Sequence, residues 1–328
     1  MKGAHFLRYL LFVLLSCFLL TLSPIVSAHT IPTMPGKIRE YPIPGGNGPN
    51  GIVFGPDGNF WVVETDGNTI DRITPGIKVT HFPIPTSQSI PAEITVGPDG
   101  NLWFTEEIGN KIGRITPQGV ITEFPVPTAN GWPAGITLGP DDNLWFTEYN
   151  AGKIGKITPG GQITEYALAD SQSVPWGIVS GPDGNLWFTE ANDNKIGRIS
   201  PDGQITEFPV PTSNSYPFGI TSDANDHLWF TEREAGKIGR ISITGKIAEY
   251  PLPKASSQPS GITLGPDGNI WFTEVIGNQI GRITPHGIIT EYLIPSDPSV
   301  AQDITPGPHG KLWFTEDYTN DIANITGR

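Results

Sequence analysis

Four carboxylates break the regular pattern of this sequence. Glu93 and Asp303 stand where five other repeats of the chain have glycine, and Glu107 and Asp317 stand where the remaining repeats differ from one another. Carboxylate oxygens are the ligands that hard divalent cations prefer. If the fold brings the four together, they are candidate ligands for Mg²⁺ or Ca²⁺. The alternative is that they are solvated surface acids. We expect no organic cofactor.

A second group of unusual positions is aromatic. Five such side chains belong to three successive repeats: Trp132, Tyr149, Trp176, Tyr216 and Phe218. On one face they would form a wall that stacks on a ring, a sugar or an apolar peptide. The alternative is that they only pack the loops. Ser260 and Gln302, at the equivalent entry positions of the last two repeats, complete the predicted substrate-binding set. The expected partner is a small molecule, a cyclic peptide or a glycan.

A repeat must position these groups. Tryptophans recur every 42 residues, at Trp61, Trp103, Trp145, Trp187, Trp229, Trp271 and Trp313, within copies of the decamer GPDGNLWFTE (residues 181–190). Seven copies without insertion indicate one repeated supersecondary unit, because any change of length would disturb both neighbours. The tryptophans are therefore predicted to lie in the core.

Each copy of the decamer also ends on glutamate. The seven are Glu64, Glu106, Glu148, Glu190, Glu232, Glu274 and Glu316. Sevenfold sameness does not suit a site for a single substrate, so we predict a structural role. The expected partners are the basic residues of the third strands: Arg72, Arg114, Lys156, Arg198, Arg240 and Arg282.

Each unit contains four β-prone runs, such as residues 135–138, 144–148, 153–158 and 162–168. Asp-Gly pairs between runs are a strong hairpin signal, and four strands in about 40 to 50 residues are typical of a propeller blade. Residues 37–44 read as an orphan fourth strand, which the last repeat lacks. The sequence predicts an all-β, seven-bladed β-propeller of four-stranded antiparallel blades, with the last blade closed by the N-terminal strand.

The topology of such a blade defines one face for function. The loops that enter the first strands and the turns after the glutamates lie on the same face, because successive antiparallel strands reverse direction. All the carboxylates and aromatic residues singled out above belong to these loops, turns or first strands. We call this side of the ring the variable face.

The N-terminal residues favour secretion. Lys2 and Arg8 precede an apolar run over residues 10–22, and small residues precede His29. This pattern predicts a secretory signal peptide over residues 1–28 and one propeller domain over residues 29–328. An uncleaved membrane anchor and lipid attachment at Cys17 are the alternatives. Cys17 is the only cysteine, so the mature chain would have no thiol chemistry.

The charge of the chain limits its partners. A formal net charge of −13 opposes binding to nucleic acid and to anionic lipid, both of which attract basic surfaces. We therefore expect no nucleic acid, and no membrane contact after signal cleavage. The predicted protein is an extracellular monomer.

Three runs carry a resemblance to a known family. Residues 102–106 (LWFTE), 110–117 (NKIGRITP) and 121–127 (ITEFPVP) closely resemble the streptogramin B lyases, the virginiamycin B lyase family, and the likeness covers essentially the whole mature chain. The resemblance implies a propeller that supports a Mg²⁺-assisted elimination, which opens the ester of a cyclic depsipeptide antibiotic. It also implies a histidine base in a Pro-His-Gly-Ile-like entry motif.

The chain departs from the family at this motif, because Ser260 and Gln302 occupy the histidine positions of the last two repeats. The mature chain's histidines lie elsewhere, at His29, His81, His227, His286 and His309. The resemblance leaves Asp317, next to Glu316, as a metal carboxylate. Asp303 becomes the candidate replacement base if its pKa is raised by burial or by neighbouring carboxylates. Asp303 and Asp317 are thus the predicted catalytic residues.

Three functions remain open. The first is a secreted lyase of this family with altered catalytic groups. The second is a non-catalytic ligand-binding propeller. The third is a lactone hydrolase that uses a metal-bound water on the same face.

Overall fold

The computed structural model describes residues 38–326, so the predicted signal peptide, residues 1–28, lies outside the described residues. These residues form 28 strands and one short 3-10 helix, η1 (Pro308–Gly310). The strands make seven antiparallel four-stranded sheets. Within residues 38–326, no helix has the length and apolar character needed to cross a membrane.

Equivalent strands of the seven blades have closely matching bounds. The first strands are β2 (Pro49–Phe54), β6 (Pro91–Val96), β10 (Pro133–Leu138), β14 (Pro175–Ser180), β18 (Pro217–Ser222), β22 (Pro259–Leu264) and β26 (Ala301–Pro306). The second strands are β3 (Phe60–Glu64), β7 (Leu102–Glu106), β11 (Leu144–Glu148), β15 (Leu186–Glu190), β19 (His227–Glu232), β23 (Ile270–Glu274) and β27 (Lys311–Glu316).

The two outer layers follow the same order. The third strands are β4 (Thr69–Ile73), β8 (Lys111–Ile115), β12 (Lys153–Ile157), β16 (Lys195–Ile199), β20 (Lys237–Ser242), β24 (Gln279–Ile283) and β28 (Asp321–Thr326). The fourth strands are β5 (Val79–Pro83), β9 (Ile121–Pro125), β13 (Ile163–Ala167), β17 (Ile205–Pro209), β21 (Ile247–Pro251), β25 (Ile289–Leu293) and β1 (Ile38–Pro42).

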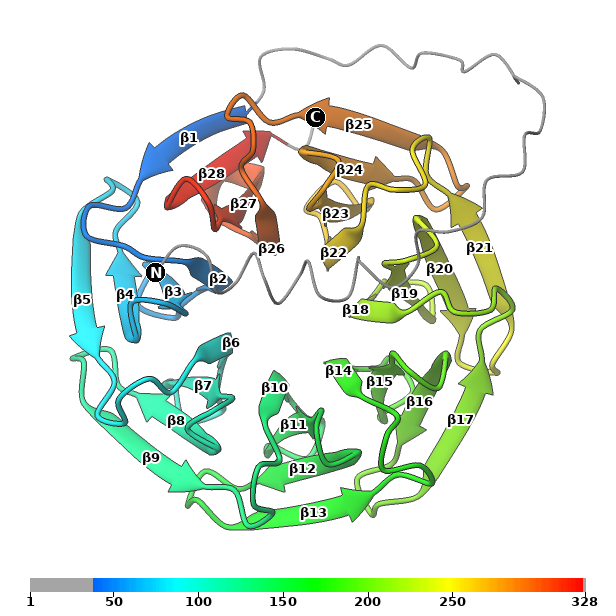
Figure 1. Cartoon of the computed structure of the whole chain (residues 1–328), viewed down its shortest axis with the longest axis horizontal. Coiled ribbons are helices and arrows are strands. Elements are labelled where there is room, and N and C mark those ends of the chain that lie inside the picture. Colours follow the sequence, from blue (N-terminus) through cyan, green and yellow to red (C-terminus); the bar gives the residue numbers. More distant parts are fainter. Residues whose placement is uncertain (1–37, 327–328) are drawn as a thin grey trace, which may run out of the picture. The chain divides into compact units, whose positions relative to one another are not determined.

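The seven sheets form a closed ring, with the first strand of each blade nearest the axis and the fourth strand at the rim (Figure 1). Each first strand contacts the first strands of the blades on either side, and β2 contacts both β6 and β26. The predicted seven-bladed propeller is therefore confirmed.

The N-terminal strand closes the ring, as predicted. β1 pairs with β28 from Ile38 to Pro42, and the Tyr41 ring stacks on Trp313 with 5.6 Å between centroids. The Ile43 N–H extends the contact by donating to the carbonyl oxygen of Asn320 over 2.9 Å. Blade 7 thus joins strands from the two ends of the sequence.

The repeated decamer forms the core, also as predicted. In blade 4, Leu186, Trp187 and Phe188 are completely buried. The Trp187 indole N–H donates to Asp183 Oδ1 over 3.0 Å, which ties the second strand to the preceding turn. The Phe188 ring lies against Gly197 of the third strand so closely that a Cβ atom there would overlap it. Glycine at this position is therefore required by packing.

The predicted pairing of the glutamates with third-strand basic residues is wrong. In the ladder Trp187 is opposite Arg198, whereas Glu190 is opposite Lys195 at the other end of the strand. Arg198 instead lies over the Trp187 ring at 5.4 Å from its centroid, with its Nη1 atom 3.6 Å from Asp183 Oδ2. The basic residue therefore belongs to the tryptophan end of the blade.

The glutamates are buried acids instead. All seven have no exposed surface, and burial is the largest cause that raises the pKa of each to about 8. For Glu106 the second cause is the charge of Glu123 on the fourth strand, which Lys111 holds at 2.8 Å. A neutral carboxylic acid is therefore the favoured state of these sites at neutral pH, and in blades 2 to 5 it lies behind a Lys-Glu ion pair.

Deleting residues 38–42 should destabilise the fold and cause self-association. The deletion removes the strand that covers β28 and leaves an unpaired sheet edge, which is a template for pairing with another chain. We expect a loss on the order of 3 kcal/mol or more, the scale of removing a buried aromatic side chain. Thermal unfolding and size-exclusion chromatography would measure both effects. Tyr41→Phe is the control, and an unchanged melting temperature after the deletion would contradict strand closure.

The buried glutamates should also make stability depend on pH. Their folded pKa of about 8 exceeds the ordinary value of 4.5, so the folded state keeps protons that the unfolded state releases. The free energy of unfolding should therefore fall as pH rises from about 4.5 to 8, by at most about 1.4 kcal/mol per pH unit for each group. Urea unfolding across this range would measure it, and Glu190→Gln should flatten the dependence. A free energy of unfolding that increased with pH would refute this assignment.

Candidate functional site

A backbone contact joins the two kinds of loop on the variable face. The residue before each first strand has a left-handed conformation, with φ of 55° at both Trp132 and Tyr216. Its carbonyl oxygen accepts the N–H of the residue that follows the buried glutamate, at 3.2 Å for Tyr149 and Trp132 and 3.1 Å for Arg233 and Tyr216. Side chains from the entry loop and from the turn are therefore held next to each other.

This arrangement brings four predicted aromatic residues into one continuous set, which we call the aromatic wall: Trp132, Tyr149, Trp176 and Phe218. Successive ring centroids are 5.4, 5.1 and 4.7 Å apart, and the last pair is stacked. All four side chains keep part of their surface exposed. The wall therefore offers partly exposed aromatic surface across blades 3 to 5.

Two further residues adjoin the wall. The guanidinium of Arg233 lies over the Phe218 ring, 4.7 Å from its centroid, so a cation stands at the end of the set. Tyr216, the fifth predicted aromatic residue, enters β18 one position before Pro217 and holds the turn of Arg233 through its carbonyl oxygen. Ligand binding by these residues remains a prediction.

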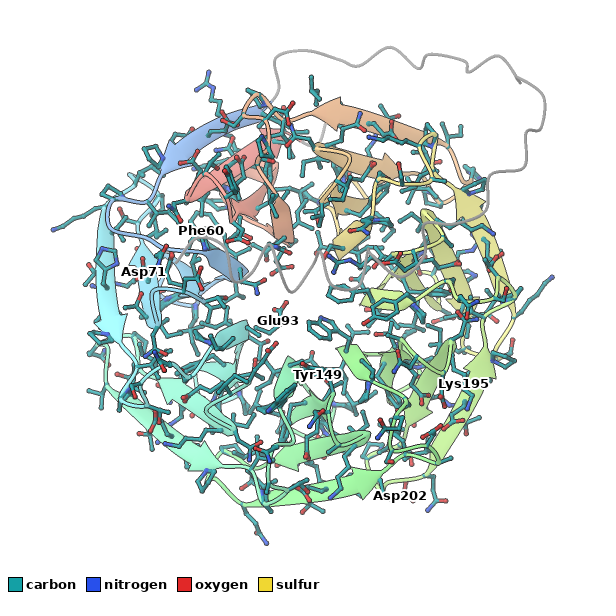
Figure 2. All side chains as sticks on the ribbon, in the orientation of Figure 1. Phe60, Asp71, Glu93, Tyr149, Lys195 and Asp202 are labelled. Atoms are coloured by element: carbon teal, nitrogen blue, oxygen red, sulfur yellow. The ribbon has the colours of Figure 1, made fainter. Side chains whose placement is uncertain are left out.

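On the opposite arc, Glu93 and Asp303 come together near the axis of the ring. Figure 2 shows Glu93 at the inner edge of the blades, with Tyr149 on the blade 3 side. The first strand between them is β2, where Gly51 packs against β6. A Cβ atom at Gly51 would lie 2.8 Å from Ala92 O and 2.9 Å from Glu93 Cα. Glycine here lets β2 pack closely against β6, and the charge of Asp303 reaches Glu93 across blade 1.

Hydrogen bonds orient one member of this pair. Asp303 Oδ2 accepts the Ile52 N–H at 3.0 Å, and Oδ1 accepts the Ile304 N–H at 2.7 Å. Burial raises the pKa of Asp303 to about 6, and these two backbone donors oppose the rise. Burial and then the charge of Asp303 raise the pKa of Glu93 well above its usual range. Of the two groups, Glu93 is therefore the favoured place for a proton.

The remaining predicted residues lie apart from this pair or are buried. Gln302 is buried and its Nε2 is 3.4 Å from Asp317 Oδ2. Ser260 is buried, and its carbonyl oxygen accepts the Thr231 hydroxyl at 3.0 Å. Glu107 is largely buried, and its N–H donates to the carbonyl oxygen of Ile90. These contacts give each residue a place in the framework of the face.

The four predicted metal ligands are not gathered into one cluster within residues 38–326. Among residues 38–326, no group of three or more histidine, cysteine, aspartate or glutamate side chains is arranged to hold a metal ion. A cation held by the protein alone generally needs more ligands than the Glu93 and Asp303 pair provides. Metal binding by these carboxylates stays a prediction, and we derive no chemical step through a metal.

Histidine is absent from the variable face, as far as residues 38–326 show. His81 lies on the outer strand β5, and His227, His286 and His309 lie at or beside turns on the opposite face. Sequence reasoning nevertheless missed that His81 contacts a buried acid, Asp71, at 2.8 Å. It also left Arg233 out of the aromatic set. The sequence signal for Asp71 was its replacement of a glycine found in five other repeats.

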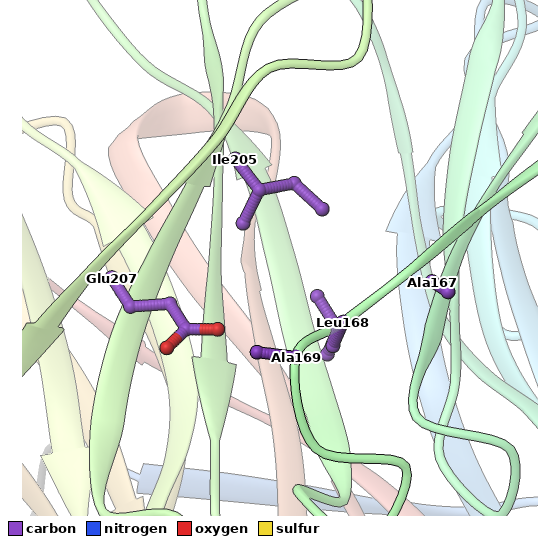
Figure 3. Close-up of a pocket in the computed structure, with 5 residues that line it drawn as sticks. All are labelled: Ala167, Leu168, Ala169, Ile205 and Glu207. Carbon is purple, nitrogen blue, oxygen red and sulfur yellow. The ribbon is translucent and has the colours of Figure 1, made fainter.

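A pocket of about 530 Å³ lies at the rim, away from these groups. Its lining comes from the end of β13 and from β17, with Leu168 facing Ile205 and Glu207 (Figure 3). Glu207 Oε2 forms an ion pair with Lys195 Nζ at 2.6 Å. This pocket belongs to the outer strands and is separate from the candidate site.

Comparison with solved structures gives close matches. The chain is 41% identical to a virginiamycin B lyase from Staphylococcus aureus, with 88% of this chain and 99% of that one covered and a TM-score of 0.85. A streptogramin B lyase structure is 38% identical, with 88% and 97% covered and a TM-score of 0.84. A catalytically inactive His-to-Ala variant of the Staphylococcus aureus enzyme, solved with quinupristin, is 40% identical, with 88% and 99% covered and a TM-score of 0.85.

A search of curated protein sequences found no match. The model of the virginiamycin B lyase family matches residues 26–176 and 160–328, which together span nearly the whole chain. The blade architecture, the matched length and the identity to solved relatives agree. The chain therefore belongs to the virginiamycin B lyase family.

Proposed function

We propose that this protein is an extracellular binding propeller that takes a compact ligand with an aromatic or other planar apolar ring on its variable face. The observation that carries this proposal is the aromatic wall, whose rings lie in continuous contact and remain partly exposed. Aromatic faces bind rings, sugar faces and apolar peptide groups with geometric preference and little loss of side-chain freedom. The predicted signal peptide supports the extracellular location.

A cyclic peptide of the quinupristin type fits this chemistry best. A related propeller has been solved with quinupristin, and the family resemblance implies a cyclic depsipeptide antibiotic as the ligand. In this chain the wall occupies one arc and the Glu93 and Asp303 pair lies across the axis. A ligand placed over the ring would therefore meet apolar contact on one side and a carboxyl pair on the other.

Binding is favoured over the family reaction because of the missing histidines. In the quinupristin relative, a His-to-Ala change accompanies loss of catalysis. Here the resembling entry positions are Ser260 and Gln302, whose side chains cannot act as a general base at neutral pH. The rest of the variable face keeps the means to bind a ligand.

A second candidate function is a lyase in which Asp303 replaces the histidine. A pKa of about 6 places this carboxylate close to the range where a general base is effective at neutral pH. In the elimination, Asp303 would take a carbon-bound proton while a carbon–carbon double bond forms and the ester C–O bond breaks. The linear product would keep the mass of the cyclic substrate.

Quinupristin should bind to the purified protein, and Trp176→Ala should weaken binding at least tenfold. Trp176 contacts two neighbours of the wall, and loss of a central interface aromatic typically costs about 2 kcal/mol or more. Isothermal titration calorimetry would measure the dissociation constants. Ile288→Ala, on an exposed turn of the opposite face, is the control and should bind normally. Equal affinity of all three proteins would show that the wall is not the binding surface.

Mass spectrometry and chromatography of the incubated ligand would decide between the two functions. The binding proposal predicts unchanged cyclic quinupristin. A linear product of equal mass that disappears with Asp303→Asn would establish the lyase, and a product heavier by one water would indicate hydrolysis. Parallel incubations with and without Mg²⁺ would show whether an added cation matters to either outcome.

A further inference from the structure

The first blade departs from the polar pattern of the other blades. In blades 2 to 5 the third strand carries a lysine that pairs with a glutamate of the fourth strand, as in Lys111 and Glu123 at 2.8 Å. In blade 1 the third strand carries an acid, Asp71, and the fourth strand carries His81 in the position of Glu123. Thr69 occupies the position of the lysine, and Asp71, two residues further along the third strand, lies opposite His81.

Packing makes room for this exchange. Asp71 is opposite Val62 in the ladder, whereas the equivalent pair in blade 2 is Gly113 opposite Phe104. The phenylalanine ring there leaves no space for a side chain on the third strand. The smaller valine of blade 1 leaves space for the Asp71 carboxyl group, which is completely buried. Two substitutions on adjacent strands thus place an acid inside a single blade.

A series of side-chain contacts connects the rim of the ring with Asp71 inside the blade. His81 is about one-third exposed, at 37%. Its Nε2 is 3.1 Å from Pro44 O, and its Nδ1 is 2.8 Å from Asp71 Oδ1. Asp71 interacts with Glu64 of the second strand through its charge. Glu64 Oε2 accepts the Asn47 N–H at 2.5 Å.

These contacts fix where protons must be. Pro44 O can only accept, so Nε2 of His81 must donate to it. The contact between Nδ1 and Asp71 also needs a proton, because two lone pairs cannot form a hydrogen bond. Oε1 of Glu64 and Oδ2 of Asp71 are buried and have no hydrogen-bond partner within residues 38–326. A proton shared between the two carboxyl groups would satisfy both oxygens.

The pKa values agree with this proton count. Burial and then the charge of Asp71 raise the pKa of Glu64 to about 8, and Asp317 adds to the rise through its charge. Burial raises the pKa of Asp71, and the hydrogen bond and charge of His81 oppose that rise. The titratable groups in this series of contacts are therefore Asp71 from β4, His81 from β5 and Glu64 from β3, and the more distant Asp317 acts on them through its charge.

His81 and Glu64, at the two ends of this series of contacts, hold the segment that enters blade 1. Pro44 and Asn47 belong to the connection between β1 and β2. The same connection is fixed to blade 7 where the Gly48 N–H donates to Asn320 Oδ1 at 3.0 Å. Gly48 packs near Asp317, because an added Cβ atom would lie 3.4 Å from its Oδ1. The contacts of His81 and Glu64 therefore hold the connection between β1 and β2, where the ring closes and the variable face begins.

We propose that His81, Asp71 and Glu64 form a proton-sharing chain through the first blade, by which the protonation state at the rim sets the position of residues 44–50 on the variable face. His81 and Asp71 are positioning residues in this proposal, since they contact no expected ligand. Histidine is the side chain suited to such a role, because its ordinary titration falls between pH 5 and 8. The proposal goes beyond ligand binding and requires no ligand for its test.

The backbone amide of Asn47 is a direct reporter, because it donates to Glu64. In ¹⁵N-resolved NMR of the ligand-free mature protein between pH 5 and 9, its signal should shift with a midpoint near pH 8 as Glu64 ionises. Glu64→Gln should abolish the transition. The amide of Thr86 is an internal control, because it donates to Glu123 in blade 2 at 2.9 Å. Hydrogen bonds and Lys111 hold the pKa of Glu123 below its usual range, so this signal should stay constant.

Two variants with opposite expected effects test the linkage. Asp71→Asn removes a negative charge beside Glu64, so the Asn47 midpoint should move to lower pH. His81→Gln removes the group that balances Asp71, so the midpoint should move to higher pH. His227→Gln, which contacts Asp223 on the opposite face, should leave it unchanged.

The proposal is overturned if the Asn47 midpoint is the same in the unchanged protein and in both linked variants. His81 lies at the exposed rim, so His81→Gln is expected to fold. If Asp71→Asn does not fold, the midpoint measured in His81→Gln decides the question. A shift in His81→Gln that also appeared at Thr86 would indicate a general change of the ring and would equally count against the chain. Quinupristin binding plays no part in these outcomes, so the proposed function and this inference can fail separately.

Discussion

Each tryptophan of the second strands is buried between two blades, and this contact fixes the spacing of the whole ring. Trp145 of blade 3 packs in one cluster with Leu186 and Phe188 of blade 4, and the same arrangement recurs around the ring. Its indole N–H is held by Asp141 of the preceding turn at 2.9 Å. Because both neighbours depend on this contact, the strands have little freedom to vary in length or direction.

A rigid ring leaves variation to the loops of one face. The left-handed residue before each first strand holds the turn that follows the buried glutamate, whatever its side chain is. Trp132, Val174 and Tyr216 occupy equivalent backbone positions with φ of 55°. A common backbone can therefore present an aromatic wall on one arc and carboxylates on another without a change in the blades.

The sequence predicted the parts of the fold that depend on period. A spacing of 42 residues and Asp-Gly turns define the blades, and an orphan strand at one end matches a missing strand at the other. Polar pairing was harder, because it depends on strand register. Arg198 was expected near Glu190 but lies opposite Trp187, three residues away along β15.

The candidate site shows the same division. The aromatic residues could be grouped from equivalent positions in successive repeats, because adjacent blades bring such positions together. The metal hypothesis also needed the distance between carboxylates of different blades, which the repeat does not specify. Glu93 and Asp303 are close enough to interact by charge, whereas Asp317 lies next to Gln302. Blade order identified one pair but could not identify a complete set of ligands.

Blade 1 shows why departures from symmetry are informative inside a blade as well as on its loops. A Lys-Glu pair keeps its charges across the ordinary pH range, so blades 2 to 5 hold their outer strands in one state. In blade 1 an aspartate in the position of Gly113 lies opposite a histidine in the position of Glu123, and histidine is the side chain whose ordinary titration falls within that range. The buried Glu64 has an equivalent in every blade, and in blade 1 the neighbouring acid Asp71 connects it to the exposed rim through His81. The repeat therefore supplies a buried acid seven times, and two substitutions link one copy to the solvent.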